Sequence, residues 1–356
     1  MVKLISGKTR QRIVIPDFRM EKIIGWDADN AYPQRVLDLI LASGTASSCV
    51  KTYKRFIKGQ GFADVGQKIK YGKLLESIAD DKSKLGTFAI HVQWNELGDI
   101  VKLSHVPVEY CRLGTDGMIC VYNNWDKRSL RENYDVTKIR RYNTYNPFKL
   151  GEQIDEAGGI ENYNGQIMWV KPDDSEYPLA PCDSILQDIK TDSSVQTFKN
   201  KNIRTNFMAS HMFVHKGKFE SEQAKQEFED YLEHFQGAES VGNIMLLEAE
   251  MDEAMPELKP FTIQNNDKLW EFTETSIKNN IVQNYMIPPV LAGILQAGKL
   301  GTASEIEDAT IYYNDITKDD RIEIESALKL LLGENVSIVE MTSLKPKLNE
   351  TDNNSQ

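Results

Sequence analysis

The sequence predicts a mixed α+β fold in which long helices connect two regions that contain strands. In the first half of the chain, the spacing of apolar residues changes from the helical period of 3.6 to the strand period of two. In the second half, two long helical patterns flank a short segment with strand character, and a third follows a loop with three glycines. We therefore expect an α+β domain, a long helix, a small α/β module, a second long helix, the loop and a third long helix.

The composition is that of a soluble protein. The chain has 356 residues, of which 40% are hydrophobic and 27% are charged, enough for two or three domains. No run of about 18 apolar residues occurs, so we expect no membrane span, and the first residues lack the apolar core of a signal peptide. The four cysteines form no CxxC pair, which predicts reduced thiols in a protein that folds in a cytosol.

The N-terminal region should contain two helices before its strands begin. Residues 1–30 read as irregular, with a short strand candidate at Arg12–Ile15. A helix is predicted from Pro33 through Phe56, where two glycines soon end it. A second helix is predicted from Tyr71 to Lys84, with its leucines facing inward.

Strands follow that second helix. Phe88–Trp94 alternates apolar and polar residues, a turn follows, and Ile100–Leu103 returns, which predicts a hairpin. Further strands are predicted near Val108–Leu113, Met118–Tyr122, Ile139–Tyr142 and Ile167–Val170.

The first long helix should run from Ser184 to about Ala209, with Asp183 as its N-cap. The module after it should hold a helix from Ser221 to Phe235 and three strands, near Met212–Val214, Asn243–Leu247 and Leu258–Ile263. A second long helix is predicted over residues 266–286.

The third long helix should follow the glycine-bearing loop. Thr302 and Glu305 form a capping box, so the helix is predicted to begin there and to continue to about Leu332. The polar residues 344–356 are expected to be disordered.

Charge is concentrated in one stretch of the chain. The net charge is -11, and the stretch from Glu220 to Glu257 holds twelve acidic residues against one base, Lys225. Such a run is either a solvated face or a docking surface for a basic partner. An acidic chain does not grip DNA through phosphate contacts, although a channel through which DNA slides remains compatible with this balance.

Catalytic motifs are weak. Gly293–Leu300 fits the P-loop pattern GxxxxGK, but Leu300 stands where a Mg²⁺-binding Ser or Thr is needed, and a helix rather than a strand should precede it. His211 and His215 have the spacing of zinc ligands without the glutamate of HExxH. We therefore predict neither an enzyme nor a cofactor nor a metal site.

Three segments carry a resemblance to a known family. The first is LGTFAIHVQW at Leu85–Trp94 followed by LSHVPVE at Leu103–Glu109, the second is NIRTNF at Asn202–Phe207, and the third is the segment Ile277–Gly293 with TASEIEDA at Thr302–Ala309. In their order and spacing, over residues 30–335, they resemble the portal, or head–tail connector, proteins of tailed double-stranded DNA bacteriophages.

This resemblance implies a portal-like architecture with a reduced or absent crown, because little sequence follows the third helix. It implies, in order, a wing (1–182), a stem helix (183–210), a clip (211–263), a second stem helix (264–288), a tunnel loop (289–301), a spine helix (302–335) and a reduced crown with a disordered tail (336–356). It further implies a homo-oligomeric ring, typically a dodecamer, at one capsid vertex of the virion, assembled in the host bacterial cytoplasm.

The implied ring is a channel for viral genome packaging and ejection. Its partners would be double-stranded DNA, the major capsid protein, the terminase large subunit and a head–tail adaptor, with no membrane. The implied DNA-facing residues in the tunnel loop are Leu291, Gly293, Ile294, Leu295, Gln296, Gly298, Lys299, Leu300 and Gly301. The implied polar stripe on the stem helices consists of Lys190, Lys201, Arg204 and Lys278. The implied docking residues of the clip are Glu220, Glu222, Glu227, Glu229, Asp230, Glu233 and Glu239.

Alternatives remain open at this point. One is an enzyme that binds a nucleotide at the degenerate P-loop, 293–300, and another is a capsid adaptor that binds protein but never DNA. Within the portal reading, Lys299 either faces DNA, giving a girdle of roughly twelve positive charges in the ring, or pairs with an acid such as Glu305.

Overall fold

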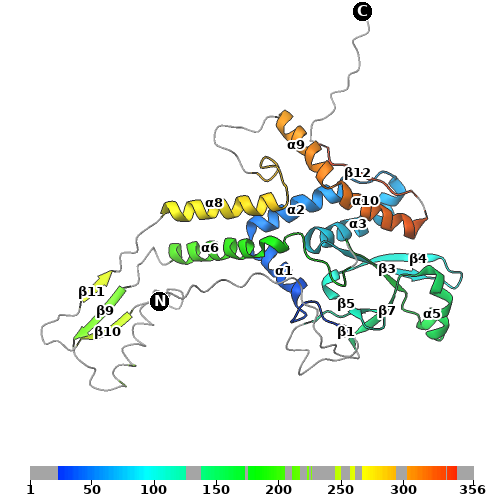
Figure 1. The fold of residues 1–356 in the computed structure, drawn as a ribbon, viewed down its shortest axis with the longest axis horizontal. Helices are drawn as coiled ribbons and strands as arrows, with labels where there is room; N and C mark the ends of the chain where they lie inside the picture. The colour runs from blue at the N-terminus through cyan, green and yellow to red at the C-terminus, as the bar shows by residue number, and fades with distance from the viewer. Residues whose placement is uncertain are drawn as a thin grey trace, which may run out of the picture. The chain divides into compact units, whose positions relative to one another are not determined.

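In the computed structural model, the chain forms two compact units. Figure 1 labels their helices and strands. Unit 1 comprises residues 1–190 and 279–356, and unit 2 comprises residues 191–278. The structure describes residues 23–125, 138–172, 175–204, 211–216, 223, 226, 245–249, 257–260, 267–293, 303–333 and 335–342. The predicted strand at residues 12–15 and the predicted disordered tail at 344–356 lie outside these ranges.

Unit 1 begins with two helices where the sequence predicts one. Helix α1 spans Tyr32–Ala42 and helix α2 spans Gly44–Lys58, so the prediction of a continuous helix was wrong at Ser43. Ser43 is fully buried and extended, and its hydroxyl accepts a hydrogen bond from the Ala46 N–H at 3.0 Å. A serine that caps the next helix competes with helix continuation, which explains the break.

Helix α3 spans Val65–Leu85 and is six residues longer at its start than predicted. Asp64 caps it by accepting a hydrogen bond from the Gln67 N–H at 2.7 Å, and Gly86 ends it in the left-handed conformation, at φ 75°. The periodic pattern did not predict the first turns of α3, because their apolar residues, Val65 and Ile69, are exposed rather than buried.

A seven-stranded sheet forms the other layer of unit 1. The predicted hairpin is confirmed as β3 and β4, and the four further predicted strands are also present. In sheet order the strands are β1 (Ile23–Ile24), β5 (Cys111–Gly114), β6 (Ile119–Val121), β7 (Arg140–Thr144), β8 (Gln166–Val170), β3 (Phe88–Trp94) and β4 (Ile100–Val106). Neighbouring strands are antiparallel except for β7 and β8, and β4 is an edge strand.

The main core lies where α2, α3 and α10 meet this sheet. Phe88, Ile90 and Val92 of β3 are fully buried and pack in one cluster with Ile78 of α3 and Leu328 of α10. A two-stranded sheet, β2 (Gly61–Phe62) with β12 (Ile338–Val339), ties the end of the described chain to the segment after α2.

The predicted third long helix is also two helices. Helix α9 spans Ala303–Ile316 and helix α10 spans Lys318–Leu332, so the prediction of one helix was wrong at Thr317. The Thr317 hydroxyl donates to the Tyr313 carbonyl at 2.9 Å, a back-bond that bends helices. Thr302 of the predicted capping box lies outside the described residues.

Shorter elements and the cysteines complete unit 1. Helix α5 spans Leu150–Glu156, and single 3₁₀ turns occur at Val108–Tyr110, Pro147–Lys149, Ile160–Asn162 and Asp183–Ile185. All four cysteines are buried, and none of them forms a disulfide. Burial raises the pKa of the Cys49 thiol to about 12. Within the part of the chain that the structure describes, no helix combines the length and apolar character needed to cross a bilayer.

Unit 2 contains parts of two long helices and a small sheet. The helices are α6 (Leu186–Arg204, from residue 191 onward) and α8 (Asp267–Asn284, to residue 278). The three predicted strands are confirmed as β9 (His211–Lys216), β10 (Met245–Ala249) and β11 (Glu257–Pro260). Strand β9 is central, parallel to β10 and antiparallel to β11. The predicted helix at Ser221–Phe235 falls almost wholly outside the described residues.

Candidate functional site: paired helices and an anchored loop

Helices α6 and α8 contact each other within unit 2 through one carboxylate. Glu274 of α8 accepts hydrogen bonds from Lys278 at 2.8 Å and Gln196 at 3.3 Å, and it forms an ion pair with Lys199 of α6. The hydrogen bonds from Lys199 and Lys278 lower the pKa of Glu274 to about 2. Val195 and Ile277 are buried on the same two helices.

Within unit 1, the other ends of α6 and α8 also meet. Ser184 donates to the Asn284 side chain at 2.8 Å, Asn284 donates to the Pro181 carbonyl at 3.0 Å, and Asn280 donates to Asp188 at 3.3 Å. Asp183 lies inside the 3₁₀ turn rather than at the N-cap, and its carboxylate accepts from the Tyr32 hydroxyl at 2.7 Å.

The proposed stem stripe is only partly described. Lys190 is exposed on α6, and Lys278 is half-buried on α8, where Glu274 holds it. Lys201 and Arg204 belong to α6, but the positions of their side chains lie outside the described structure. Because Glu274 places one negative charge beside one lysine from each helix, these three groups together carry less positive charge than the two lysines would alone.

The loop after α8 starts from a fixed turn. Met286 adopts a left-handed φ of 52°, and the Ile287 N–H donates to the Val282 carbonyl at 3.2 Å, which ends α8. Pro288 then accepts from the Leu291 N–H at 2.9 Å, and Gly293 is exposed with a φ of 71° and open space where a Cβ would lie.

Leu291 and Gly293 are thus the described members of the predicted tunnel loop. Its other members are outside the described residues: Ile294, Leu295, Gln296, Gly298, Lys299, Leu300 and Gly301. The preceding element is helix α8, whereas a P-loop follows a buried strand. The structure therefore offers no P-loop context to Gly293.

Two buried contacts anchor the segments on either side of this loop. The Tyr313 hydroxyl of α9 donates to the Tyr285 carbonyl at the end of α8 at 3.0 Å, and both phenols are buried. Arg321 of α10 is 3% exposed and donates to the carbonyls of Asn314 at 2.7 Å and Phe56 at 3.2 Å. The loop therefore leaves and re-enters the fold at points tied to buried groups.

Helix α10 is also fixed to α3 by a buried charge. Lys82 lies 3.5 Å from Asp320 and forms a shorter ion pair with Glu323, and Asp320 accepts from the Tyr53 hydroxyl at 2.6 Å. Burial raises the pKa of Tyr53, so the phenol stays protonated and continues to donate. Sequence reading missed this cluster because Asp320 and Arg321 stand in a run of charges that resembles a solvated helix face.

The remaining predicted sites have simpler outcomes. The seven acidic docking residues lie outside the described residues: Glu220, Glu222, Glu227, Glu229, Asp230, Glu233 and Glu239. His211 and His215 lie on strand β9, where four residues span roughly 13 Å, too far for one zinc ion. Among the residues that the structure describes, no group of three potential ligands could hold a metal ion.

Comparisons with known proteins give structural likenesses. No protein-family model and no curated protein matches the sequence. A chain in the neck of the native gene transfer agent (GTA) particle, computed with C12 symmetry, is similar at a TM-score of 0.52 and 14% identity, over 88% of this chain and 86% of that one. A chain in the virion of the native GTA particle is similar at a TM-score of 0.51 and 14% identity, over 86% of this chain and 83% of that one. A chain in the neck of the empty GTA particle, computed with C6 symmetry, is similar at a TM-score of 0.50 and 14% identity, over 86% of this chain and 84% of that one.

At this identity, the likeness establishes a shared fold. The predicted α+β class is confirmed by the sheet and helices of unit 1 and by chains of phage-like particles that share the arrangement.

Proposed function

We propose that this chain is a portal protein, one subunit of a ring through which double-stranded DNA enters and leaves a phage-like particle. The observation that carries the proposal is the likeness over 88% of the chain to a component of a particle neck computed with C12 symmetry. A likeness over 88% of the chain extends into both units, so it is not limited to a common small domain.

The proposed parts follow the order of elements. The wing is residues 1–182, the stem consists of 183–210 and 264–288, and the clip is 211–263. The tunnel loop is 289–301, the spine is 302–335, and 336–356 is what remains of the crown. Three features support this division: the helix pair of α6 and α8, the small β9–β10–β11 sheet between them in sequence, and the anchored turn at Pro288.

The mechanism we propose is physical rather than chemical. A channel must hold DNA weakly enough for it to slide, and a chain with a net charge of -11 avoids strong attraction to phosphates. On the stem, Glu274 engages Lys199 and Lys278 and reduces the positive charge available to DNA. Weak transient contacts would come from single bases such as the exposed Lys190 and, in the loop, Lys299.

The proposed partners follow from the same role. The acidic clip would dock a basic surface of the terminase large subunit during packaging and of a head–tail adaptor afterwards, while the wing would contact the major capsid protein. Charge complementarity of this kind governs specificity and the rate of association. The assembled ring would reside at one vertex of the virion, after assembly in the host bacterial cytoplasm.

Imaging and mass measurement of the purified chain test the proposal. Negative-stain images should show rings with a central hole, and native mass spectrometry should give about 490 kDa for twelve copies of the 40.6 kDa chain. A monomer at micromolar concentration under several salt conditions, also in the presence of capsid protein, would contradict the proposal.

A second experiment separates a portal from a ring-shaped adaptor. Particles produced without this chain should be empty of DNA if the chain is the portal, because packaging starts at the portal. DNA-filled heads without tails would instead identify the chain as an adaptor that joins completed heads to tails.

A further inference from the structure

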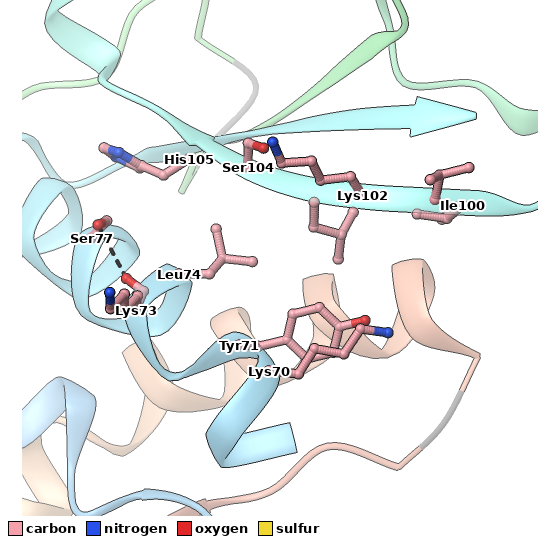
Figure 2. Close-up of a pocket in the computed structure, with 11 residues that line it drawn as sticks. Lys70, Tyr71, Lys73, Leu74, Ser77, Ile100, Lys102, Ser104 and His105 are labelled. Carbon is pink, nitrogen blue, oxygen red and sulfur yellow. Dashed lines mark hydrogen bonds between the residues drawn. The ribbon is translucent and has the colours of Figure 1, made fainter. Parts of the chain in front are cut away.

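A groove lies between helix α3 and the edge strand β4 of unit 1 (Figure 2). Its volume is about 410 Å³, and its two sides come from segments of one unit, so the groove belongs to a single folded body. Its α3 side includes Tyr71 and the buried Leu74, and its β4 side runs from Ile100 to His105.

The edge strand β4 forms one side of this groove. Six consecutive residues of the strand, Ile100 to His105, line it, so side chains from both faces of the pleat contribute. Among the described strands, β4 pairs only with β3, which leaves its other edge without a strand partner. β4 is seven residues long, and Val101 is 63% exposed. A long edge with exposed β-branched residues is a template for an added strand.

The groove is positively charged. Lys70 and Lys73 of α3 and Lys102 of β4 line it, and no acidic side chain is among its lining residues. The nearest acids along α3 are paired: Glu76 with Lys54, away from the groove, and Asp81 with His105, which lines the groove, at 2.8 Å.

We propose that this groove binds an extended acidic segment of a partner protein, which adds to β4 as an eighth strand of the sheet. Backbone hydrogen bonds to β4 would supply affinity, and the three lysines would select acidic side chains on the added strand. The inference is independent of the proposed portal function, because it rests on the groove alone.

Other occupants fit the charge less well. Residues 1–22 of this chain carry six bases and two acids, so they would be repelled by the lysines. Residues 343–356 carry two bases and two acids and offer no net attraction. Pairing of β4 with β4 of a second copy would bring two Lys102 side chains close together, and like charges across a strand pair are destabilising.

Peptide binding to the full-length chain tests the proposal. The probe is a fluorescein-labelled heptapeptide of alternating valine and glutamate, and its control has lysine in place of glutamate. We expect the acidic peptide to bind, with an affinity that falls as salt is raised, and the basic peptide not to bind. The double variant Lys73→Glu/Lys102→Glu should lower the affinity at least tenfold. Lys68→Glu, an exposed lysine of α3 outside the groove, is the matched control and should bind as the unaltered chain does.

Strand addition itself is tested with two N-methylated forms of the acidic peptide, one methylated on every valine and the other on every glutamate. Alternate N–H groups of a strand point to opposite sides, so only one methylated form should lose binding. Equal binding of both forms would overturn strand addition. Absence of binding, or unchanged binding to Lys73→Glu/Lys102→Glu, would overturn the proposal that the groove is the binding site. Binding to the isolated subunit that disappears on self-association would assign the groove to a second copy, against the proposal.

Discussion

The joint between α9 and α10 should depend on Arg321, and replacing this residue by methionine tests how strongly. The guanidinium donates to the carbonyls of Phe56 and Asn314 and to the Thr317 hydroxyl at 2.7 Å, and all of these bonds are buried. Its fourth acceptor, Glu340, has a side chain that is 56% exposed. Methionine keeps an apolar stem but leaves the buried acceptors without this donor, at about 1–3 kcal/mol for each group left unsatisfied.

We therefore expect Arg321→Met to lower the free energy of unfolding by about 3–5 kcal/mol, because two carbonyls and one hydroxyl lose their buried donor together. Glu340→Gln should cost under about 1 kcal/mol, because exposed ion pairs contribute little. Lys318→Met, at an exposed position of the same helix, is the control for the loss of a charge. Urea unfolding followed by tryptophan fluorescence reports mainly on unit 1, which contains four of the five tryptophans: Trp26, Trp94, Trp125 and Trp169.

The comparison of these variants can refute the reasoning. If Arg321→Met costs less than about 1 kcal/mol, the buried carbonyls find other donors, and the joint does not depend on this residue. If Glu340→Gln costs as much as Arg321→Met, the ion pair rather than the carbonyl bonds fixes the joint.

Three further predictions concern the helix pair, the loop and the clip. Because the folded-state pKa of Glu274 is depressed to about 2, its contribution to stability is present above the usual pKa near 4.5 and is lost as the pH falls toward 2. Urea unfolding should therefore show the unaltered chain losing more stability than Glu274→Gln over that range; parallel losses would contradict the pairing with the lysines. Lys299→Glu should leave rings intact but reduce DNA retention in packaged particles, whereas failure of assembly would make Lys299 structural, and loss of ATP binding alone would favour the P-loop alternative. Reversal of Glu227, Glu229 and Glu233 to lysine should preserve rings and abolish docking to the motor or adaptor in a pull-down; unchanged, salt-independent docking would show that the acidic run is only a solvated face.

The sequence predicted elements whose pattern repeats within a few residues. The hairpin of β3 and β4 was predictable because Phe88, Ile90 and Val92 alternate with residues on the opposite face of the strand. The breaks at Ser43 and Thr317 were not, because each depends on where one hydroxyl donates or accepts. At Thr317 the decisive partner, Arg321, also reaches Phe56, which is 265 residues away in sequence.

The candidate sites also differ in whether a local sequence pattern could predict them. The end of α8 before Pro288 was predictable from the helical pattern and the two prolines that follow it, while the tunnel loop after it stays a prediction. The groove between α3 and β4 was not found, because Lys73 and Lys102 belong to separate amphipathic elements and come together only when the helix packs beside the strand. A cluster of like charges from two elements leaves no local signal in either one.

The contacts that hold α9 and α10 in place differ in kind from the contacts proposed for binding partners. The joint at Thr317 and the link from Tyr313 to Tyr285 use buried hydrogen bonds, several of them to backbone carbonyls, which salt screens little. The partner contacts proposed for the α3–β4 groove and for the acidic run instead rely on attraction between opposite charges. Under the proposed portal function, the chain would exchange partners during assembly while its loop stays anchored, and this division would permit both. Rising salt should therefore release bound partners well before it loosens α9 and α10, and hydrogen exchange at the amides of both helices, measured alongside partner release, would show the order of the two events.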